Sequence, residues 1–228
     1  MLDTLERVEL ETASGRGETL RLLNQSLGEL TQRVRPSLVR VVDGGRGAGA
    51  GVVLHERGLI VTNAHVAHRR RTLVEDWRAR QLPARLLALD RQHDLAVLSV
   101  EADDLEPLAI GDSQALAAGS WLLAMGHPFG VLGGTTAGVV IGVGGDLPEA
   151  PPGRDWLAMS LQLRPGHSGG PVIDVHGQLL GVNTMMAGPQ VGLAVPAHVV
   201  KRFLKEGIGP VKPRHRRWAR PQAEPRML

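Results

Sequence analysis

The succession of short apolar runs between residues 37 and 195 constrains the fold of this chain more than any other feature. The runs are rich in Val, Leu, Ile and Ala, and most are about four to eight residues long, as expected for β-strands. Glycine-containing turns separate them, and the 228-residue chain holds 29 glycines. In chain order the runs are SLVRVV, GVVLHERGLIVTN, ARLLAL, LAVLSV, SWLLAMG, AGVVIGVG, WLAMSLQL, PVIDVHGQLLGVNTMM and VGLAVP. The sequence therefore predicts an all-β fold.

Two antiparallel six-stranded β-barrels account for this order, because closing a sheet into a barrel leaves no exposed strand edge. We expect the first barrel over about residues 37–107 and the second over about 115–195. Residues 101–119 hold few strand signals and are interpreted as the connection between them. Within the second barrel, His176-Gly177 is the predicted turn of a hairpin.

A helix is predicted at each end of the barrels. Leucines at positions 20, 23, 27 and 30, followed by Val34, form one apolar stripe that we expect to pack on the protein's own barrel, and Pro36 ends that helix. The segment 196–206 is the second helix, with Pro196 at its first position and Gly207 just past its end. Residues 1–17 are expected to be flexible, and residues 210–228 to form a disordered basic tail.

Composition excludes several classes of protein. The chain has no cysteine, so it can form neither a disulfide framework nor a thiolate site. A net charge of +3 that is concentrated in the tail gives no reason to expect nucleic acid as a partner. The sequence shows neither a transmembrane run nor the apolar core of a secretory signal. We therefore expect a cytoplasmic protein, or a periplasmic or extracellular one if a targeting segment has been removed.

The strongest local signal for chemistry is Gly166-His167-Ser168-Gly169-Gly170-Pro171. Glycines beside a serine allow a tight turn that exposes the hydroxyl and brings backbone N–H groups together without obstruction from Cβ atoms. Such converging N–H groups stabilise the oxyanion of an acyl-transfer reaction. Ser168 is therefore the candidate nucleophile. The alternative is that this sequence forms only a glycine-rich turn between two strands.

A serine nucleophile needs a base, and the base needs a carboxylate to orient it. His65 follows the apolar run GLIV, where a rigid strand end would hold it at a cleft. Asp94 opens the run DLAVL and is the favoured carboxylate; Asp90 is its nearest competitor, and Asp112 and Asp174 are weaker candidates. Base and carboxylate then come from the first barrel and the nucleophile from the second.

Four segments, in the same order, also resemble one protein family. They are GAGAGVVLHERGLIVTNAHVA, PARLLALDRQHDLAVLSV, LLAMGHPFGVLGGTTAGVVIGVG and LQLRPGHSGGPVIDVHGQLLGVNTMMAGPQVGLAVPAHVVKRFL. They are similar to the HtrA/Deg serine proteases of the bacterial, disulfide-free kind, over about residues 34–206. The resemblance implies a trypsin-like double barrel over residues 18–209 and the triad His65, Asp94 and Ser168. It also implies an oxyanion hole from the N–H groups of Gly166 and Ser168, with His167 between them.

The chain departs from the family pattern in three ways. His167 stands where the family usually has Asn, and we expect its side chain to point outward. LQLRPG replaces an asparagine-containing run before the serine, so the oxyanion loop is a candidate for an inactive resting state. After Gly209 only the basic tail remains, so peptide sensing through the family's C-terminal PDZ domain is expected to be absent or to lie on a removed portion.

The substrate prediction combines the resemblance with the residues. An extended polypeptide would add as a strand beside residues 181–186, which favours unfolded proteins as substrates. The predicted contacts are Leu163, Arg164, Asn183, Thr184, Met185 and Met186. The pocket for the residue before the cut is expected to be lined from residues 163–167, 181–186 and 191–194. These segments contain no acid, so we expect small or aliphatic residues before the cut rather than Lys or Arg. The resemblance further implies a possible homotrimer with the first helix near the contact.

Cofactors and metals are not expected. The run GGRGAGAG lacks the Lys-Ser/Thr of a phosphate-binding loop and leads into a strand. The histidines at 93, 127, 167 and 176 lack metal-ligand spacing. The main rival hypothesis is a peptide-binding or chaperone-like module whose loop around 164–166 holds the site inactive.

Overall fold

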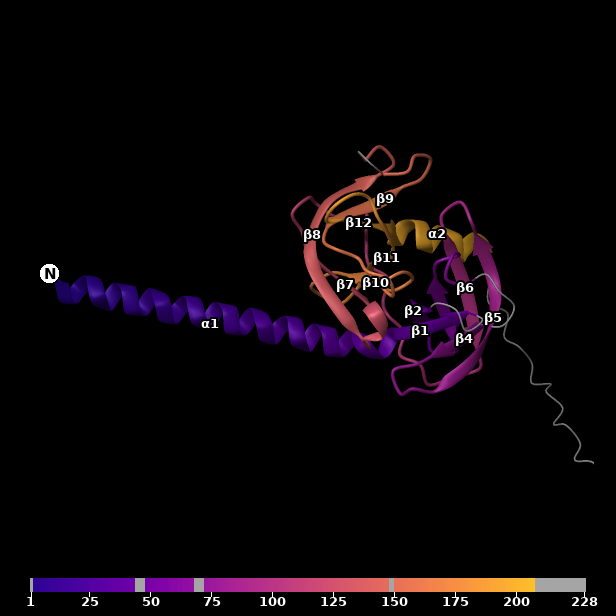
Figure 1. Ribbon diagram of the computed structural model, residues 1–228, viewed down its shortest axis with the longest axis horizontal. Coiled ribbons are helices and arrows are strands. Elements are labelled where there is room, and N and C mark those ends of the chain that lie inside the picture. The colour runs from indigo at the N-terminus through magenta and orange to yellow at the C-terminus, as the bar shows by residue number, and fades with distance from the viewer. Residues whose placement is uncertain (1, 44–47, 68–71, 148–149, 208–228) are drawn as a thin grey trace, which may run out of the picture.

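The computed structural model describes residues 2–43, 48–67, 72–147 and 150–207, and it has two closed antiparallel barrels (Figure 1). The first barrel closes in the order β1-β2-β3-β6-β5-β4 and the second in the order β10-β11-β12-β9-β8-β7. The fold prediction is confirmed. The first-barrel strands are β1 (Leu38–Asp43), β2 (Ala48–His55), β3 (Leu59–Thr62), β4 (Thr72–Glu75), β5 (Gln81–Asp90) and β6 (Leu95–Val100). The second-barrel strands are β7 (Trp121–Gly126), β8 (Gly134–Gly144), β9 (Trp156–Ser160), β10 (Pro171–Ile173), β11 (Leu179–Met186) and β12 (Val191–Pro196).

The two α-helices flank the strands in the chain. Helix α1 (Leu2–Val34) is followed by the 3₁₀ turn η1 (Arg35–Ser37), a second 3₁₀ turn η2 (Pro128–Gly130) follows β7, and α2 (Ala197–Gly207) follows β12. The prediction placed the start of the first helix near residue 18, whereas α1 begins at Leu2. No helix in the described part of the chain is long and apolar enough to cross a membrane.

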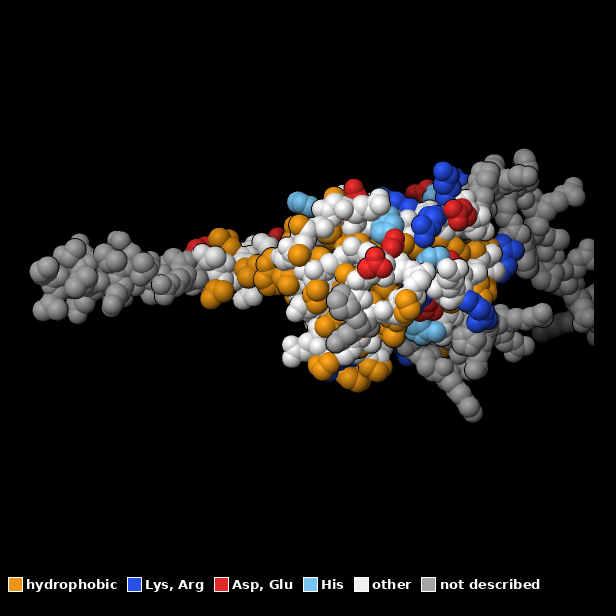
Figure 2. Space-filling model, turned by 90° about the horizontal axis from the view of Figure 1, so that it is seen from above, with side chains coloured by type: hydrophobic (Ala, Val, Ile, Leu, Met, Phe, Trp, Pro, Cys, Tyr) orange, Lys and Arg blue, Asp and Glu red, His pale blue; other side chains and the backbone are white. Residues whose placement is uncertain are grey.

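Helix α1 projects away from the barrels as one long rod (Figure 1). Only its last turns join the protein interior: Leu30 and Val34 are buried, whereas the side chains of Leu20 and Leu23 are 62% and 47% exposed. The prediction that the whole stripe packs on its own barrel is therefore wrong for its first half. Figure 2 shows apolar side chains gathered on the part of the rod nearest the barrels.

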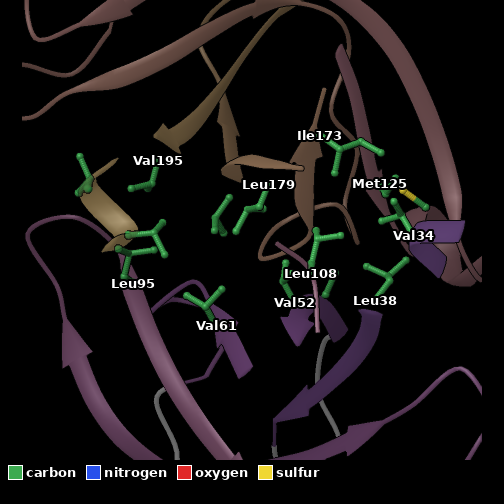
Figure 3. Packing of buried hydrophobic residues seen from close by; sticks show 14 of the residues in the cluster. Val34, Leu38, Val52, Val61, Leu95, Leu108, Met125, Ile173, Leu179 and Val195 are labelled. Atoms are coloured by element: carbon green, nitrogen blue, oxygen red, sulfur yellow. The ribbon is translucent and has the colours of Figure 1, made fainter. Parts of the chain in front are cut away.

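A shared core joins the two barrels. Val52, Val61 and Leu95 from the first barrel meet Ile173 and Leu179 from the second in one buried cluster (Figure 3). The ends of both helices complete this cluster, with Leu30 and Val34 of α1 and Val199, Val200 and Phe203 of α2. Each Å² of apolar area removed from water contributes about 25 cal/mol. This cluster is therefore the main interaction that fixes one barrel against the other.

Candidate active site

His65 and Asp94 lie together at one end of the first barrel. The Nδ1 atom of His65 is 2.7 Å from Oδ2 of Asp94, and its backbone N–H donates to Oδ1 at 3.0 Å. The bidentate contact fixes the imidazole, with the proton on Nδ1 and the lone pair on Nε2. The His65 side chain is 50% exposed, so Nε2 is open to a substrate. This pair can therefore act as an oriented general base.

Neighbouring backbone holds the pair in place. The carbonyl of Asn63 accepts the N–H groups of Val66 and Ala67 and thereby turns the chain sharply after β3. The Asn63 side-chain amide donates to the carbonyl of Asp94 at 3.0 Å, and Asp94 has a φ of +56°, a conformation that aspartate tolerates better than most residues. Sequence reasoning missed this role of Asn63, although an amide two residues before a strand-end histidine was visible.

The other carboxylates have different partners. Asp90 bonds His93 at 2.6 Å, Asp112 accepts the N–H of Gln114, and Asp174 caps the β10–β11 hairpin turn. Each satisfies a local turn, as acidic residues at strand ends commonly do. Among the four candidates considered, Asp94 is thus the one that the structure brings to His65.

Ser168 lies on the loop that leads into β10 of the second barrel, and this loop contacts the first barrel. The Ser168 carbonyl accepts the N–H of Ala50 at 2.8 Å, which joins the serine loop to β2. Gly169 follows with a φ of +86°, and a Cβ there would lie 2.1 Å from the Ala50 carbonyl oxygen. The close approach of the two barrels at this point therefore requires glycine.

The serine hydroxyl has a partner other than the histidine. Oγ of Ser168 donates to the carbonyl of Thr184 at 3.1 Å, and within the described residues it makes no hydrogen bond to His65. Catalytic hydrogen bonds are often formed only once substrate is bound, so this geometry fits an unoccupied site.

The loop before the serine presents two backbone donors. Gly166 has a φ of +104° and its carbonyl accepts the N–H of His127, while the N–H of His167 donates to the carbonyl of Arg164. Within the described chain, the N–H groups of Gly166 and Ser168 have no partner. These two donors are those expected of an oxyanion hole.

His167 does not point outward as predicted. It is only 2% exposed, and its Nδ1 accepts the backbone N–H of Arg164 at 3.0 Å. Burial lowers the pKa of His167 and, at the neighbouring His127, lowers the pKa to about 4. Both rings are therefore neutral at pH 7, and Nδ1 of His127 accepts the N–H of Gly133 at 3.3 Å.

The predicted substrate-contacting residues divide into two groups. Leu163 is buried with its N–H on the Met186 sulfur, whereas Arg164 and Met185 are exposed. The side chain of Asn183 is fully buried and donates to two carbonyls, and the hydroxyl of the buried Thr184 accepts the Asn63 amide. A substrate contact from these two residues would therefore come from their backbone. Strand β10 pairs with β11 only as far as Val182, so along residues 184–186 the edge of β11 opposite β12 has no partner strand in the described structure, and the Thr184 carbonyl accepts the Ser168 hydroxyl there.

A second Ser-His-Asp grouping lies elsewhere. Ser113 Oγ is 2.9 Å from Nδ1 of His198, and Nε2 of His198 is 3.1 Å from Asp155. Ser113 is fully buried and its hydroxyl accepts the His198 backbone N–H, so it serves the start of α2. No cluster of three or more His, Cys, Asp or Glu in the described ranges could hold a metal ion.

The comparison with known families agrees with this geometry. The family model of the trypsin-like peptidase domain matches residues 49–182, more than half of the chain. The chain belongs to the trypsin-like peptidase family. The match begins at the start of β2 and ends within β11, so it covers His65, Asp94 and Ser168.

Relatives of this trypsin-like peptidase include longer proteins. It is 36% identical over 164 residues to a probable periplasmic serine endoprotease, DegP-like, of Halomonas elongata, an alignment that covers 68% of this chain and 34% of that protein. It is 33% identical over 164 residues to a serine protease of Rattus norvegicus, covering 70% of this chain and 34% of that one. The chain thus matches about a third of the length of these curated relatives.

Solved structures share the fold of this trypsin-like peptidase. The serine endoprotease from Yersinia pestis aligns with a TM-score of 0.72 and 26% identity, over 80% of this chain and 66% of that one. An HtrA-type protease solved with a tripeptide aligns with a TM-score of 0.73 and 26% identity, over 79% and 63% of the respective chains. The matched relatives are HtrA/DegP-like serine endoproteases, as the sequence resemblance predicted.

Proposed function

We propose that this protein is a serine endopeptidase that hydrolyses unfolded or extended polypeptides. Ser168 is the nucleophile, His65 removes its proton and returns it to the leaving amine, and Asp94 orients His65 and stabilises the imidazolium. The N–H groups of Gly166 and Ser168 bind the oxyanion. The observation that carries the proposal is the 2.7 Å contact between His65 and Asp94 beside a serine loop with two free N–H donors.

The substrate strand would lie along residues 184–186 of β11. Main-chain hydrogen bonds to this edge do not depend on the side chains of the substrate, so extended segments of many different sequences could bind. Met185 and Met186 give the adjoining surface an apolar character, and Arg164 adds a positive charge. We therefore expect small or aliphatic residues before the cut, and a role in protein quality control, since unfolded chains expose such segments.

Casein cleavage tests the proposed activity. We expect fragments to accumulate with the wild type and to be absent with Ser168→Ala, because members of a triad act as a unit. Sequencing of the new C-termini should find mainly Ala, Val, Leu or Ile; a majority of Lys or Arg would contradict the proposed pocket. Fragments that persist in Ser168→Ala would rule out Ser168 as the nucleophile.

A peptide-binding module is the second candidate. It is favoured by one observation, the hydrogen bond of Ser168 Oγ to the Thr184 carbonyl in place of His65. Under this hypothesis the wild type would suppress aggregation of an unfolded protein without cutting it, and Ser168→Ala would behave identically.

We also propose that copies of the chain associate, with a homotrimer as the expected state. Exposed apolar side chains lie on α1 (Leu20, Leu23) and in the second-barrel half of the chain (Trp121, Phe129), and patches of this kind commonly mark interfaces. Sedimentation at micromolar concentration should give a trimer mass, which Leu20→Glu with Leu23→Glu should lower. Gln32→Glu, on the opposite face of α1, is the control, and a monomeric wild type would overturn the proposal.

A further inference from the structure

Arg154 is held rigidly at the edge of the second barrel. It lies just before β9, and its guanidinium carbon is 3.9 Å from the centroid of the Trp156 ring. Trp156 is fully buried, and its indole N–H donates to the Pro151 carbonyl at 2.8 Å. A cation stacked on a fixed aromatic ring loses little further freedom when it makes another contact. Arg154 is therefore preorganised to reach across to the first barrel.

The contact that it makes there is to the chain that carries Asp94. Nη1 of Arg154 donates to the carbonyl of Gln92 at 2.8 Å, two residues before Asp94. Burial lowers the pKa of the Arg154 guanidinium, and the carboxylates of Asp94 and Asp90 act in the opposite direction. Arg154 thus places a positive charge near the carboxylate that orients His65.

The turn that it contacts is otherwise held mainly from within. Asp90 accepts the N–H groups of Gln92 and His93 and bonds the His93 ring. From outside, Nη2 of Arg202 on α2 lies 3.4 Å from Nε2 of His93. Asp94 leaves this turn with a left-handed φ, a conformation that persists only where its surroundings enforce it.

The proposed triad also spans two bodies. His65 and Asp94 belong to the first barrel and Ser168 to the second, so their alignment depends on the contacts between the barrels. Two direct links lie close to the serine: Ala50 N–H to the Ser168 carbonyl, and the Asn63 amide to Thr184. The hydrogen bond of Arg154 to Gln92 is a third link, two residues before the Asp94 carboxylate in the chain.

We propose that Arg154 is a positioning residue for catalysis, which fixes the Asp94 turn against the barrel that carries Ser168 and supplies charge beside the carboxylate. This inference rests on the proposed protease function. Arg154 does not touch substrate in this account; it acts through Asp94 and His65. The alternative hypothesis is that Arg154 is a half-buried arginine that only stabilises the loop before β9 and has no effect on catalysis.

Arg78 supplies a matched control for that alternative. It also lies over a tryptophan, with its guanidinium 4.9 Å from the Trp77 ring, and it bonds Asp104 at 2.7 Å. Asp104 lies in the connection between the barrels, outside the proposed triad. Arg78→Met removes an arginine that lies over a tryptophan and one of its hydrogen bonds, here to a carboxylate, without touching the Asp94 turn.

The kinetic test compares Arg154→Met, Arg154→Lys and Arg78→Met in the otherwise wild-type chain. We expect Arg154→Met to lower kcat by about 10- to 100-fold, the scale of a small misplacement of a catalytic group, while KM stays unchanged. Arg154→Met removes a positive charge near the base–carboxylate pair, so the acidic limb of the pH–rate profile should move to higher pH. The charged groups that face Arg154 are the carboxylates of Asp94 and Asp90, with His93 and Arg202 behind them.

Arg154→Lys separates charge from geometry. It keeps the cation but loses the planar stacking and the directed hydrogen bond, so its acidic limb should stay near that of the wild type while kcat recovers only in part. The inference is overturned if Arg154→Met matches Arg78→Met in kcat and in pH profile, or if Arg154→Met raises KM alone.

A readout that needs no turnover separates this inference from the proposed function. The proton between Nδ1 of His65 and Asp94 should give a low-field ¹H NMR signal, because the bond is short and one partner is charged. Arg154→Met should shift or broaden that signal, and Arg78→Met should leave it unchanged. A wild type that binds but does not cut casein would contradict the protease function; an unchanged signal in Arg154→Met would overturn the positioning role.

Discussion

At the scale of single residues, the serine loop depends on backbone conformations that few side chains allow. Gly166 combines a φ of +104° with a position where a Cβ would lie 2.2 Å from the His127 carbonyl oxygen. Any other residue would have to push that carbonyl away or turn its own N–H out of the proposed oxyanion hole. The orientation of the donor and the identity of the residue are therefore linked.

Gly166→Ala should lower kcat/KM by about 10²–10³, the usual effect of losing one oxyanion donor. Gly153→Ala is the control, because Gly153 has a φ of +86° and a methyl group at this position would have no atom within 4 Å. Gly153→Ala therefore places a side chain at a similar positive φ but creates no steric clash with a neighbouring atom. Steady-state kinetics that placed the two variants within a factor of two of each other, about 0.4 kcal/mol, would contradict this account.

The neutral state of His127 makes a second prediction, about pH. Burial lowers its pKa to about 4, whereas an unfolded histidine has a pKa near 6.5. Between these values the unfolded state binds the proton and the folded state does not, so folding stability falls as pH falls from about 6.5 to 4. The loss from this group is about 3 kcal/mol. Burial of His167 acts in the same direction.

Urea unfolding at pH 7.5 and 4.5 measures this effect. His127→Asn should show a smaller difference in unfolding free energy between the two pH values than the wild type, whatever its absolute stability. The exposed His176 provides the control through His176→Asn. An equal pH difference in wild type and His127→Asn would show that His127 is not kept neutral by the fold.

Residue types at strand ends allowed much of the candidate site to be predicted from the sequence. His65, Asp94 and Ser168 stood out because each adjoins an apolar run or a glycine turn, and these are local patterns. The burial of His167 was missed although its Nδ1 bonds the backbone of nearby Arg164, and that of Asn183 was missed because its amide donates to the Met125 carbonyl, far away in the chain. Arg154 was missed for the same reason: its contact to Gln92 crosses between the barrels.

At the scale of secondary-structure elements, periodicity predicted which faces of the helices are apolar but not what covers them. The stripe on α1 has one uniform pattern, yet Leu30 is buried and Leu20 is exposed, because the helix leaves the barrel surface partway along. Strand β4 was not predicted, since four residues are too few to show alternation. The start of β5 was hidden by Pro83, because proline is unusual inside a strand.

The two leucines should respond differently to truncation. Leu30→Ala should lower the unfolding free energy by about 2–5 kcal/mol, because it leaves a cavity in the shared core. Leu20→Ala should change it by less than about 0.5 kcal/mol at dilutions where association is absent. Denaturation followed at nanomolar concentration tests both, and a large cost for Leu20→Ala would mean that its side chain is covered within a single chain.

At the scale of the whole molecule, neither barrel alone holds the proposed chemistry. The first supplies an oriented base and the second a serine with two backbone donors, and the shared core sets the distance between them. Alternating apolar runs indicated two barrels because the pattern is repeated in each half. The pattern carried no information on how the barrels face each other, since that depends on side chains that meet only after folding.

Labelling with a fluorophosphonate, followed by peptide mapping, tests the central claim most directly, because the reagent reacts with a serine only where a base activates it and an oxyanion hole receives the product. The account predicts one phosphonyl adduct, on Ser168, that is absent in Ser168→Ala and forms far more slowly in His65→Ala. Ser113, the serine of the second Ser-His-Asp grouping, should remain unmodified. An unlabelled wild type, or an adduct on any serine other than Ser168, would contradict the account.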